Sequence, residues 1–299
     1  MNTKTPAIIM GILGVILFSA KAVMVKLAYQ YEVDALSLLL LRMIFSLPFY
    51  LIIALFFLPK PEVTLNKRDY IWLVVFGFLG YYVSSYLDFL GLAYIKASLE
   101  RIILFIYPTL ILIISRVFFK KKIHTWQILA IAVTYIGIVI TFWQELSISQ
   151  GDTVLIGGGL IFAAAITYAT YLVGSGWLIP KFGSVRFTAY AMLIACTFVI
   201  LHYLIQNEND LFAFQKEVYF YGLAMAVFAT VFASFLVSES IKHIGAPNFG
   251  IIGSLGPIST IIMANVFLDE KMTVVQIFGT LIVISGVFIL AKQKERISN

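Results

Sequence analysis

The chain has 299 residues, of which 61% are hydrophobic and only 12% are charged, and its mean hydropathy is +0.98. A soluble domain carries about 25% charged residues, and a soluble protein of this length cannot bury so many apolar side chains in one or two cores. The composition therefore excludes an ordinary soluble enzyme. The net charge of +6 does not indicate nucleic-acid binding, because the basic residues form short runs between long apolar stretches.

The sequence offers few groups for metal or thiol chemistry. Cys196 is the only cysteine, and His124, His202 and His243 stand far apart from one another. This excludes a disulfide framework and leaves no cluster with the spacing of a zinc site. We predict no metal and no other cofactor.

Ten apolar stretches are long enough to cross a hydrocarbon core of roughly 30 Å as helices of about 20 residues. They lie at residues 7–28, 36–58, 70–93, 97–118, 125–143, 153–174, 185–205, 218–241, 247–268 and 273–291. The first could be read as a cleaved secretory signal, because Lys4 precedes it and Ala20 and Ala22 resemble a cleavage site. We favour a retained helix, and predict an all-α integral membrane protein with ten transmembrane helices.

The distribution of basic residues predicts the orientation in the membrane. With the N-terminus in the cytoplasm, thirteen of the sixteen Lys and Arg residues outside the spans or at their ends fall on the cytoplasmic side, and only Lys96, Lys216 and Lys271 fall on the other. This bias follows the positive-inside rule. We predict a multi-pass protein of the plasma membrane, specifically a bacterial inner membrane, with both termini cytoplasmic.

The chain resembles itself at an offset of 149 residues. Residues 95–128 and 244–277 then share eleven identities in 34 positions, including Pro108 with Pro257 and Gln127 with Gln276. We predict two five-helix repeats, at residues 1–145 and 150–299. Because five is an odd number of crossings, the second copy must run in the opposite direction, which is the inverted repeat of many secondary transporters.

The matched prolines predict a hinge. Pro108 and Pro257 each fall near the middle of a predicted span, where proline removes a backbone hydrogen bond and kinks the helix. Gly250, Gly253 and Gly256 precede the second proline at every third position, and form a small-residue surface for a close helix or a substrate. Helix packing is the alternative role for all five residues.

These segments resemble the EamA-type family of the drug/metabolite transporter superfamily. The resemblance rests on the five-plus-five pattern, on Arg42 in LLLLRMIFSLPF, on ASLERIILFIYPTLILI and on LDEKMTVVQIFGTLIVISGVFIL. It implies a transporter in which spans 1, 3, 4, 6, 8 and 9 line a central cavity and spans 5 and 10 are peripheral. An acidic residue of the family matches Glu270 in the second copy, but Lys121 occupies the corresponding position of the first.

Apart from Arg186, which stands at the start of its span, eight charged residues lie within the predicted spans, where an unpaired charge facing lipid is costly. Six of them belong to the outer part of the first repeat: Lys21, Lys26, Arg42, Asp88, Glu100 and Arg101. We predict that Lys21, Arg42 and Arg101 bind an anionic group of the substrate and that Asp88, Glu100 or Glu239 relays a proton. The alternative is that Arg42 pairs with Asp88 or Glu100 to lock helices, while Lys26 reaches the headgroups.

Aromatic side chains provide further candidates for substrate binding. We nominate Tyr82 and Tyr86 of the third span with Tyr168 and Tyr171 of the sixth, because aromatic and hydroxyl groups can sandwich a small organic solute.

The sequence favours a secondary active transporter for a small polar or amphipathic metabolite. It contains no Walker phosphate-binding loop, HExxH or GxSxG motif, so we predict that the protein is not an enzyme. A passive channel is the alternative function. The expected partners are the small-molecule substrate and the lipid bilayer, with a homodimer as a further option and no nucleic acid.

Overall fold

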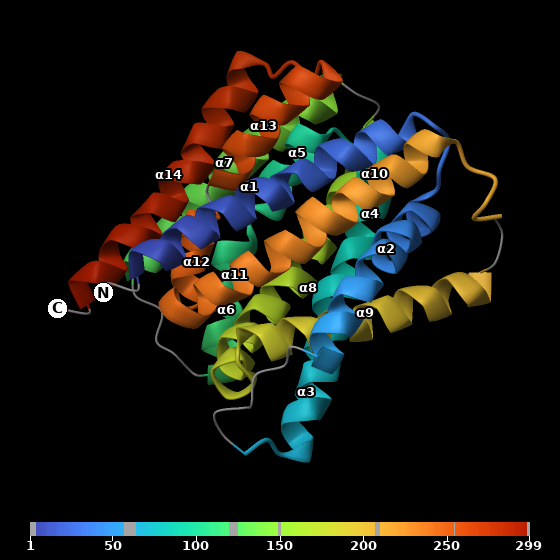
Figure 1. Ribbon diagram of the computed structural model, residues 1–299. Helices are drawn as coiled ribbons and strands as arrows, with labels where there is room; N and C mark the ends of the chain where they lie inside the picture. Colours follow the sequence, from blue (N-terminus) through green and yellow to red (C-terminus); the bar gives the residue numbers. More distant parts are fainter. Residues whose placement is uncertain are drawn as a thin grey trace.

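The computed structural model describes residues 4–56, 64–119, 125–148, 151–206, 210–253 and 255–297, and these residues contain helices and turns but no β-strand. Fourteen α-helices and two π-helices follow one another through them (Figure 1). The helices are α1 Lys4–Tyr29, α2 Ala35–Phe56, α3 Lys67–Gly77, η1 Phe78–Val83, α4 Ser84–Tyr94, α5 Ala97–Leu104, α6 Tyr107–Phe119, α7 Thr125–Ile148, α8 Gly151–Phe182, α9 Ser184–Gln206, α10 Lys216–Ala226, η2 Val227–Phe232, α11 Ala233–Ile244, α12 Ala246–Ile252, α13 Leu255–Leu268 and α14 Val274–Ile297.

The all-helical class predicted from the sequence is confirmed. Among the described residues, seven helical segments have the length and apolar character needed to cross a membrane: Thr5–Tyr29, Ala35–Phe56, Lys67–Tyr94, Ala97–Phe118, Asp152–Phe182, Ser184–Gln206 and Lys216–Ile244. The other three predicted spans coincide with helices whose described apolar stretches are shorter, at Ile131–Thr141, Leu255–Leu268 and Val274–Gly286. The number of ten crossings therefore stays a prediction.

Two helical bundles surround the centre of the molecule. In bundle A, α8 packs against the α3–η1–α4 and α5–α6 segments. In bundle B, α1 packs in the same way against the α10–η2–α11 and α12–α13 segments. Each bundle therefore combines helices from both halves of the chain.

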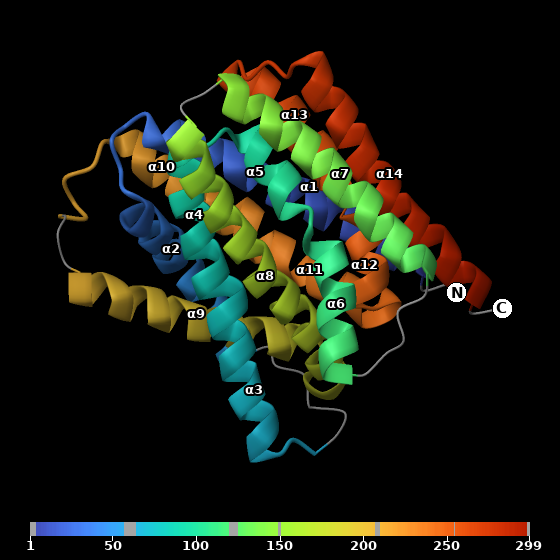
Figure 2. The ribbon, with the colours of Figure 1, turned by 180° about the vertical axis from the view of Figure 1, so that it is seen from behind.

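Helices α7 and α14 lie side by side at one edge of the molecule (Figures 1 and 2). They approach closely because Gly137 and Gly279 face each other: a Cβ atom at Gly137 would lie 2.6 Å from the carbonyl oxygen of Gly279. Among the side chains that the structure describes in these two helices, none lines the cavity described below.

The helix boundaries repeat along the chain at an offset of 149 residues. The π-helix η1 begins at Phe78 and η2 begins at Val227, 149 residues later, and both have six residues. The same offset relates the first residues of α3 and α10, Lys67 and Lys216, and those of α7 and α14, Thr125 and Val274. The offset found in the sequence thus reappears in the positions of the helical elements.

The fourth and ninth predicted spans are interrupted helices, which corrects the expectation of continuous kinked ones. Helix α5 ends at Leu104 and α6 begins at Tyr107, while α12 ends at Ile252 and α13 begins at Leu255. Pro108 and Pro257 lie in the first turns of α6 and α13, where a missing backbone N–H leaves no helical bond unmade. Near each proline the chain therefore ends one helix and begins another, instead of bending a single continuous helix.

Two glycines permit the sharp turns that follow α8 and α11. Gly183 and Gly245 have φ angles of 77° and 78°, a region that side chains with a Cβ rarely occupy. Their N–H groups donate to the carbonyl oxygens of Ile179 and Ile241, respectively, and so close the last helical turn.

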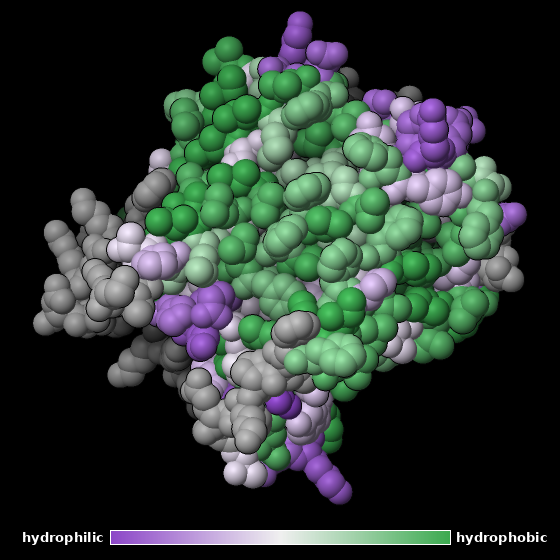
Figure 3. Space-filling model, viewed as in Figure 1, coloured by the Kyte–Doolittle hydropathy of each residue, from purple (hydrophilic) through white to green (hydrophobic). Residues whose placement is uncertain are grey.

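Hydrophobic residues cover most of the face drawn in Figure 3, and hydrophilic residues gather toward the ends of the helices. The exposed side chains include many large apolar ones, such as Leu55, Ile205 and Phe220. In water such a surface would be unfavourable, so it is the surface of a protein in a lipid bilayer.

Candidate functional site

A cavity lies at the centre of the molecule, between the two bundles. Its volume is about 60 Å³, and it is lined by Val15, Phe18, Lys21, Arg42, Gly80, Tyr81, Ser84, Ser85, Asp88, Arg101, Leu104, Phe105, Tyr107, Tyr168, Phe249, Gly253 and Gly256. These residues come from α1, α2, η1, α4, α5, α6, α8, α12 and α13 or from the two helix breaks. Span 2 contributes Arg42, whereas span 8, which the family resemblance placed in the lining, does not line this cavity.

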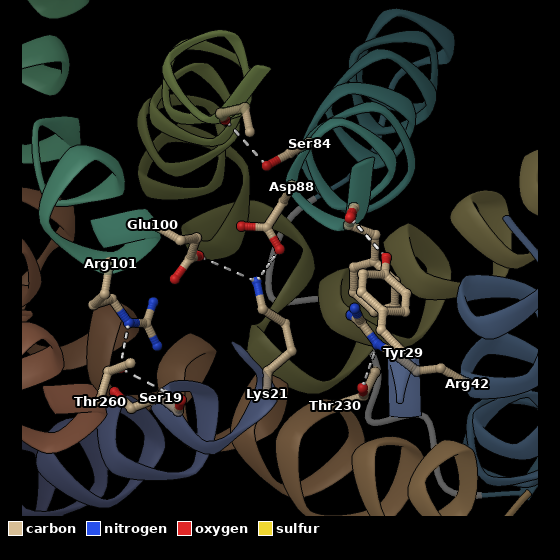
Figure 4. A network of polar contacts seen from close by, with 12 residues as sticks. Ser19, Lys21, Tyr29, Arg42, Ser84, Asp88, Glu100, Arg101, Thr230 and Thr260 are labelled. Atoms are coloured by element: carbon tan, nitrogen blue, oxygen red, sulfur yellow. Dashed lines mark hydrogen bonds and ion pairs between the residues drawn. The ribbon is translucent and has the colours of Figure 1, made fainter. Parts of the chain in front are cut away.

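The centre of the polar network is Lys21 (Figure 4). Its Nζ atom lies 2.6 Å from Oδ2 of Asp88 and 4.0 Å from Oε1 of Glu100. Both carboxylates are buried, and neither oxygen of Glu100 has a hydrogen-bond partner among the described residues. Because Lys21 belongs to bundle B, and Asp88 and Glu100 to bundle A, this cluster joins the two bundles. Asp88 and Lys21 line the cavity, and Glu100 lies behind them.

Two buried arginines flank Lys21. The Nε atom of Arg42 donates to Thr230 Oγ1 at 2.8 Å, and its guanidinium group lies 5.5 Å from the centre of the Phe89 ring. The Nε atom of Arg101 donates to Thr260 Oγ1 at 2.9 Å. The alternative predicted for Arg42, an ion pair with Asp88 or Glu100, is not found among the ion pairs of the described residues. Each arginine is instead held by a neutral hydroxyl group.

The π-helix η2 places Thr230 for this contact. Thr230 Oγ1 donates to the carbonyl oxygen of Met225, five residues earlier, at 2.8 Å, and π-helical turns are frequent at functional sites. On α13, Thr260 contacts the carbonyl oxygen of Ser19 at 3.4 Å, so Arg101, α13 and α1 form one connected network.

A second set of polar contacts joins the two bundles at one end of the molecule. Tyr29 OH donates to the carbonyl oxygen of Phe89 at 2.7 Å, and Lys26 Nζ donates to that of Leu92 at 3.1 Å. Lys26 therefore hydrogen-bonds the end of α4. The predicted alternative was that its side chain reaches the lipid headgroups.

At the same end, Glu270 caps the first turn of α5. Its carboxylate accepts hydrogen bonds from Ala97 N at 2.9 Å, from Ser98 N at 3.0 Å and from Ser98 Oγ at 2.7 Å. A carboxylate at a helix N-terminus satisfies free N–H groups and favourably meets the positive end of the helix dipole. We call this set of three contacts the Glu270 latch. Lys121, at the related position of the first copy, lies outside the described residues.

The two helix breaks contact each other and border the cavity. The hydroxyl group of Tyr107, just before Pro108, lies against Gly253, where a Cβ atom would come within 1.5 Å of it. A Cβ atom at Gly250 would lie 3.7 Å from Pro108 Cβ, and one at Gly256 would lie 3.8 Å from Arg101 Cδ. Four of the five predicted hinge residues thus lie where the interrupted helices meet, and Pro257 follows Gly256 directly. Their role as a hinge stays a prediction.

The nominated tyrosines separate into two groups. Tyr168 lines the cavity and packs edge-on against Tyr107, while Tyr171 lies behind the lining and donates to Tyr81 OH at 3.1 Å. Tyr82 and Tyr86 instead contact His202 of α9, and neither lines the cavity.

Glu239 also lies away from the central network. It accepts hydrogen bonds from Ser184 Oγ and, at 2.9 Å, from His243 Nε2, near the start of α9 and the end of α11. The structure therefore does not bring it together with Asp88 and Glu100.

Sequence reasoning did not single out Thr230 and Thr260, and it gave Glu270 only by resemblance. The available signal was weak, because each threonine is one hydroxyl residue in an apolar helix. Only the folded structure shows that these two hydroxyl groups face the arginines of other helices.

An all-helical chain with long apolar spans around a buried, charged cavity defines a multi-pass membrane protein with an internal polar site. The chain belongs to the EamA-like transporter family, whose model matches residues 5–143 and again residues 155–292. It thereby belongs to the drug/metabolite transporter superfamily.

Relatives of similar length carry the same general description. The uncharacterized transporter YcbK of Bacillus subtilis is 29% identical over 292 residues, which cover 95% of this chain and 91% of that protein. The uncharacterized transporter YetK of the same organism is 26% identical over 248 residues, which cover 82% of this chain and 75% of that protein. A solved crystal structure, 15% identical, matches 98% of both chains with a TM-score of 0.69, and so shows likeness of fold alone.

Proposed function

We propose that this protein is a secondary transporter that carries a small polar or amphipathic metabolite across the plasma membrane by alternating access. The observation that carries the proposal is the Lys21–Asp88 ion pair, which joins the two bundles beside a central cavity bordered by interrupted helices. Discontinuous helices near a central site are typical of secondary transporters.

The shared offset of 149 residues supports an inverted repeat of five helices each. The related elements make related contacts, since α1 packs on α11 and α13 as α8 packs on α4 and α6. In two inverted copies, a change that opens one side and closes the other exchanges the roles of the copies. We propose ten crossings on this basis, with both termini in the cytoplasm.

The size of the cavity supports a conformational cycle. Sites for small organic molecules have volumes of about 300–1,000 Å³, whereas this cavity has about 60 Å³. Binding of a metabolite therefore requires the bundles to move apart. Contacts between the bundles that must break in this motion include Lys21–Asp88 and the Glu270 latch.

The energy for transport would come from a solute gradient, from exchange or from protons. Lys21 lies between two buried carboxylates, so a proton taken up by Glu100 or Asp88 would change the ionic attraction between the bundles. This arrangement supports proton coupling through Glu100 and Asp88 rather than through the distant Glu239.

Flux measurements test the proposal. Purified protein is first screened by thermal unfolding against amino acids, nucleobases, organic acids and sugars, because a bound ligand raises the unfolding temperature. The compound found is then followed into proteoliposomes that are preloaded with the same unlabelled compound. A carrier gives saturable uptake that the preload accelerates, whereas non-saturating flux with no such acceleration would establish the channel alternative. Flux that ignores an imposed pH gradient would refute proton coupling.

A further inference from the structure

Arg42 and Arg101 are held in the same way on different helices. In each, the Nε atom donates to a threonine hydroxyl group, Thr230 for Arg42 and Thr260 for Arg101. Each also has one buried terminal nitrogen, Nη1 of Arg42 and Nη2 of Arg101, without a hydrogen-bond partner among the described residues. Both residues are more than nine-tenths buried, and both line the cavity.

A buried guanidinium group without a carboxylate partner is unfavourable unless another acceptor approaches it. Both threonines are neutral, so they fix the position of each guanidinium group without themselves supplying a counter-charge. In Figure 4 the two groups lie on opposite sides of Lys21, and both point toward the middle of the network. Both arginines line the same cavity, so both guanidinium groups are placed to contact a ligand bound there.

The charges at the cavity have an excess of positive sign. The charged residues in its lining are Lys21, Arg42, Arg101 and Asp88, and one carboxylate oxygen of Asp88 lies 2.6 Å from Lys21 Nζ. When Glu100, behind the lining, is counted as ionised, three cations still face two carboxylates. One negative charge supplied by a ligand restores neutrality.

The rest of the lining is aromatic and aliphatic. Phe18, Phe105 and Phe249 border the cavity together with the rings of Tyr107 and Tyr168. Such a surface suits an apolar group and is poorly matched to a solute that is polar on all sides.

We propose that the substrate is a small organic carboxylate with an apolar portion, whose carboxylate group accepts hydrogen bonds from the terminal nitrogens of Arg42 and Arg101. This inference rests on the proposed function and names the substrate class for the same site. The planar guanidinium fork matches a carboxylate better than a lysine does, which is why two arginines rather than two lysines fit this task. Asp88 and Glu100 oppose binding of a second negative charge, and this disfavours phosphate esters.

Binding to the purified protein in detergent tests the substrate class separately from transport. The probes are phenylacetate, its uncharged analogue phenylacetamide, phenyl phosphate and the cation phenethylammonium, each titrated while the unfolding temperature is followed. We expect the unfolding temperature to increase saturably with phenylacetate and to stay unchanged with the other three compounds. The proposal is overturned if phenylacetate does not stabilise the protein while the amide, the phosphate ester or the cation does.

Variants locate the site. Arg42→Gln and Arg101→Gln should each weaken phenylacetate binding roughly ten- to a hundredfold, the loss expected for a hydrogen bond to a charged group. Arg186→Gln is the matched control, because Arg186 lies near the start of α9 and does not line the cavity. Where a glutamine variant fails to fold, Thr230→Val or Thr260→Val keeps the guanidinium group, removes the hydroxyl group that accepts its hydrogen bond, and should weaken binding less strongly.

The outcomes distinguish this inference from the proposed function. Phenylacetate that binds equally well to the wild type, Arg42→Gln and Arg101→Gln overturns the inference, whatever the flux measurements give. Arginine-dependent binding without saturable flux in proteoliposomes supports the carboxylate site and contradicts the transporter proposal. Saturable flux of a neutral solute with no binding of phenylacetate contradicts the carboxylate site and leaves the transporter proposal intact.

Discussion

Lys21 of α1 and Asp88 of α4 form a buried ion pair that spans the two bundles, with the ammonium nitrogen 2.6 Å from a carboxylate oxygen. The two side chains are only 11% and 2% exposed, so water screens their attraction little. A buried pair of this kind is costly to break by removal of one partner, because the other charge then has no compensation. Its position between bundles makes it both a structural contact and a candidate element of the transport cycle.

Lys21→Met should destabilise the protein and abolish transport. It leaves Asp88 buried without its partner, a change that costs about 3–5 kcal/mol in buried pairs. We expect a lower unfolding temperature in detergent and at least a tenfold decrease in uptake by proteoliposomes. The double variant Lys21→Met with Asp88→Asn should recover stability but not uptake, since it removes both charges. Unchanged uptake by Lys21→Met would refute a role of Lys21 in transport.

Glu270→Ala should open the end of the molecule at which the latch lies. It removes three hydrogen bonds to the first turn of α5, and loss of a helix cap costs about 0.5–2 kcal/mol. The cavity residue Ser85 then becomes more accessible. This is measured as faster labelling of Ser85→Cys by a membrane-impermeant maleimide, with buried Cys196 replaced by serine.

Glu217→Ala is the acidic control for this experiment, because Glu217 lies in the first turn of α10 and does not belong to the latch. Equal labelling rates in Glu270→Ala, Glu217→Ala and the parent would show that the Glu270 latch does not hold this end closed.

The positions of the helices could be predicted closely from the sequence, because hydropathy alone separates apolar spans from loops in a membrane protein. The expected span at 185–205, for example, is helix α9 from Ser184 to Gln206. The π-helices could not be predicted, since a single extra residue per turn leaves the apolar pattern almost unchanged. The helix breaks were expected as bends because a proline predicts the loss of a hydrogen bond but not whether the helix bends or restarts.

The site was only partly predictable for a related reason. Charge in an apolar span marks Lys21, Arg42 and Asp88 as unusual, and the cost of burying such groups makes this signal strong. Aromatic residues give no comparable signal, because they are equally favourable in the cavity lining, in the core and toward lipid. Tyr168 and Tyr82 therefore look alike in the sequence, although only Tyr168 lines the cavity.

Pro108→Ala should slow the transport cycle more than it weakens substrate binding. Alanine restores an N–H group at the beginning of α6 and allows α5 and α6 to join as one continuous helix. A continuous helix resists the local rearrangement that an interrupted one permits. We expect the apparent affinity to change less than threefold and the maximal rate to fall at least fivefold in proteoliposomes. Pro48→Ala is the control, because Pro48 lies inside the continuous helix α2. A similar decrease in rate for both variants would show that the break at Pro108 has no special role.

Gly253→Ala should force the two interrupted helices apart. A Cβ atom at this position would lie 1.5 Å from Tyr107 OH and 2.8 Å from Tyr107 Cζ, so the tyrosine ring must leave its place beside the cavity. Overpacking of this kind costs about 1–3 kcal/mol, which a decrease in unfolding temperature would reveal. Gly159→Ala is the matched control, because a Cβ atom there has no other atom within 4 Å. Replacing Tyr107 by phenylalanine removes the nearest clashing atom, so Gly253→Ala with Tyr107→Phe should be more stable than Gly253→Ala alone. If the single variant is as stable as Gly159→Ala, the contact between the two helix breaks is not the tight one described here, and the hinge role assigned to Gly253 loses its physical basis.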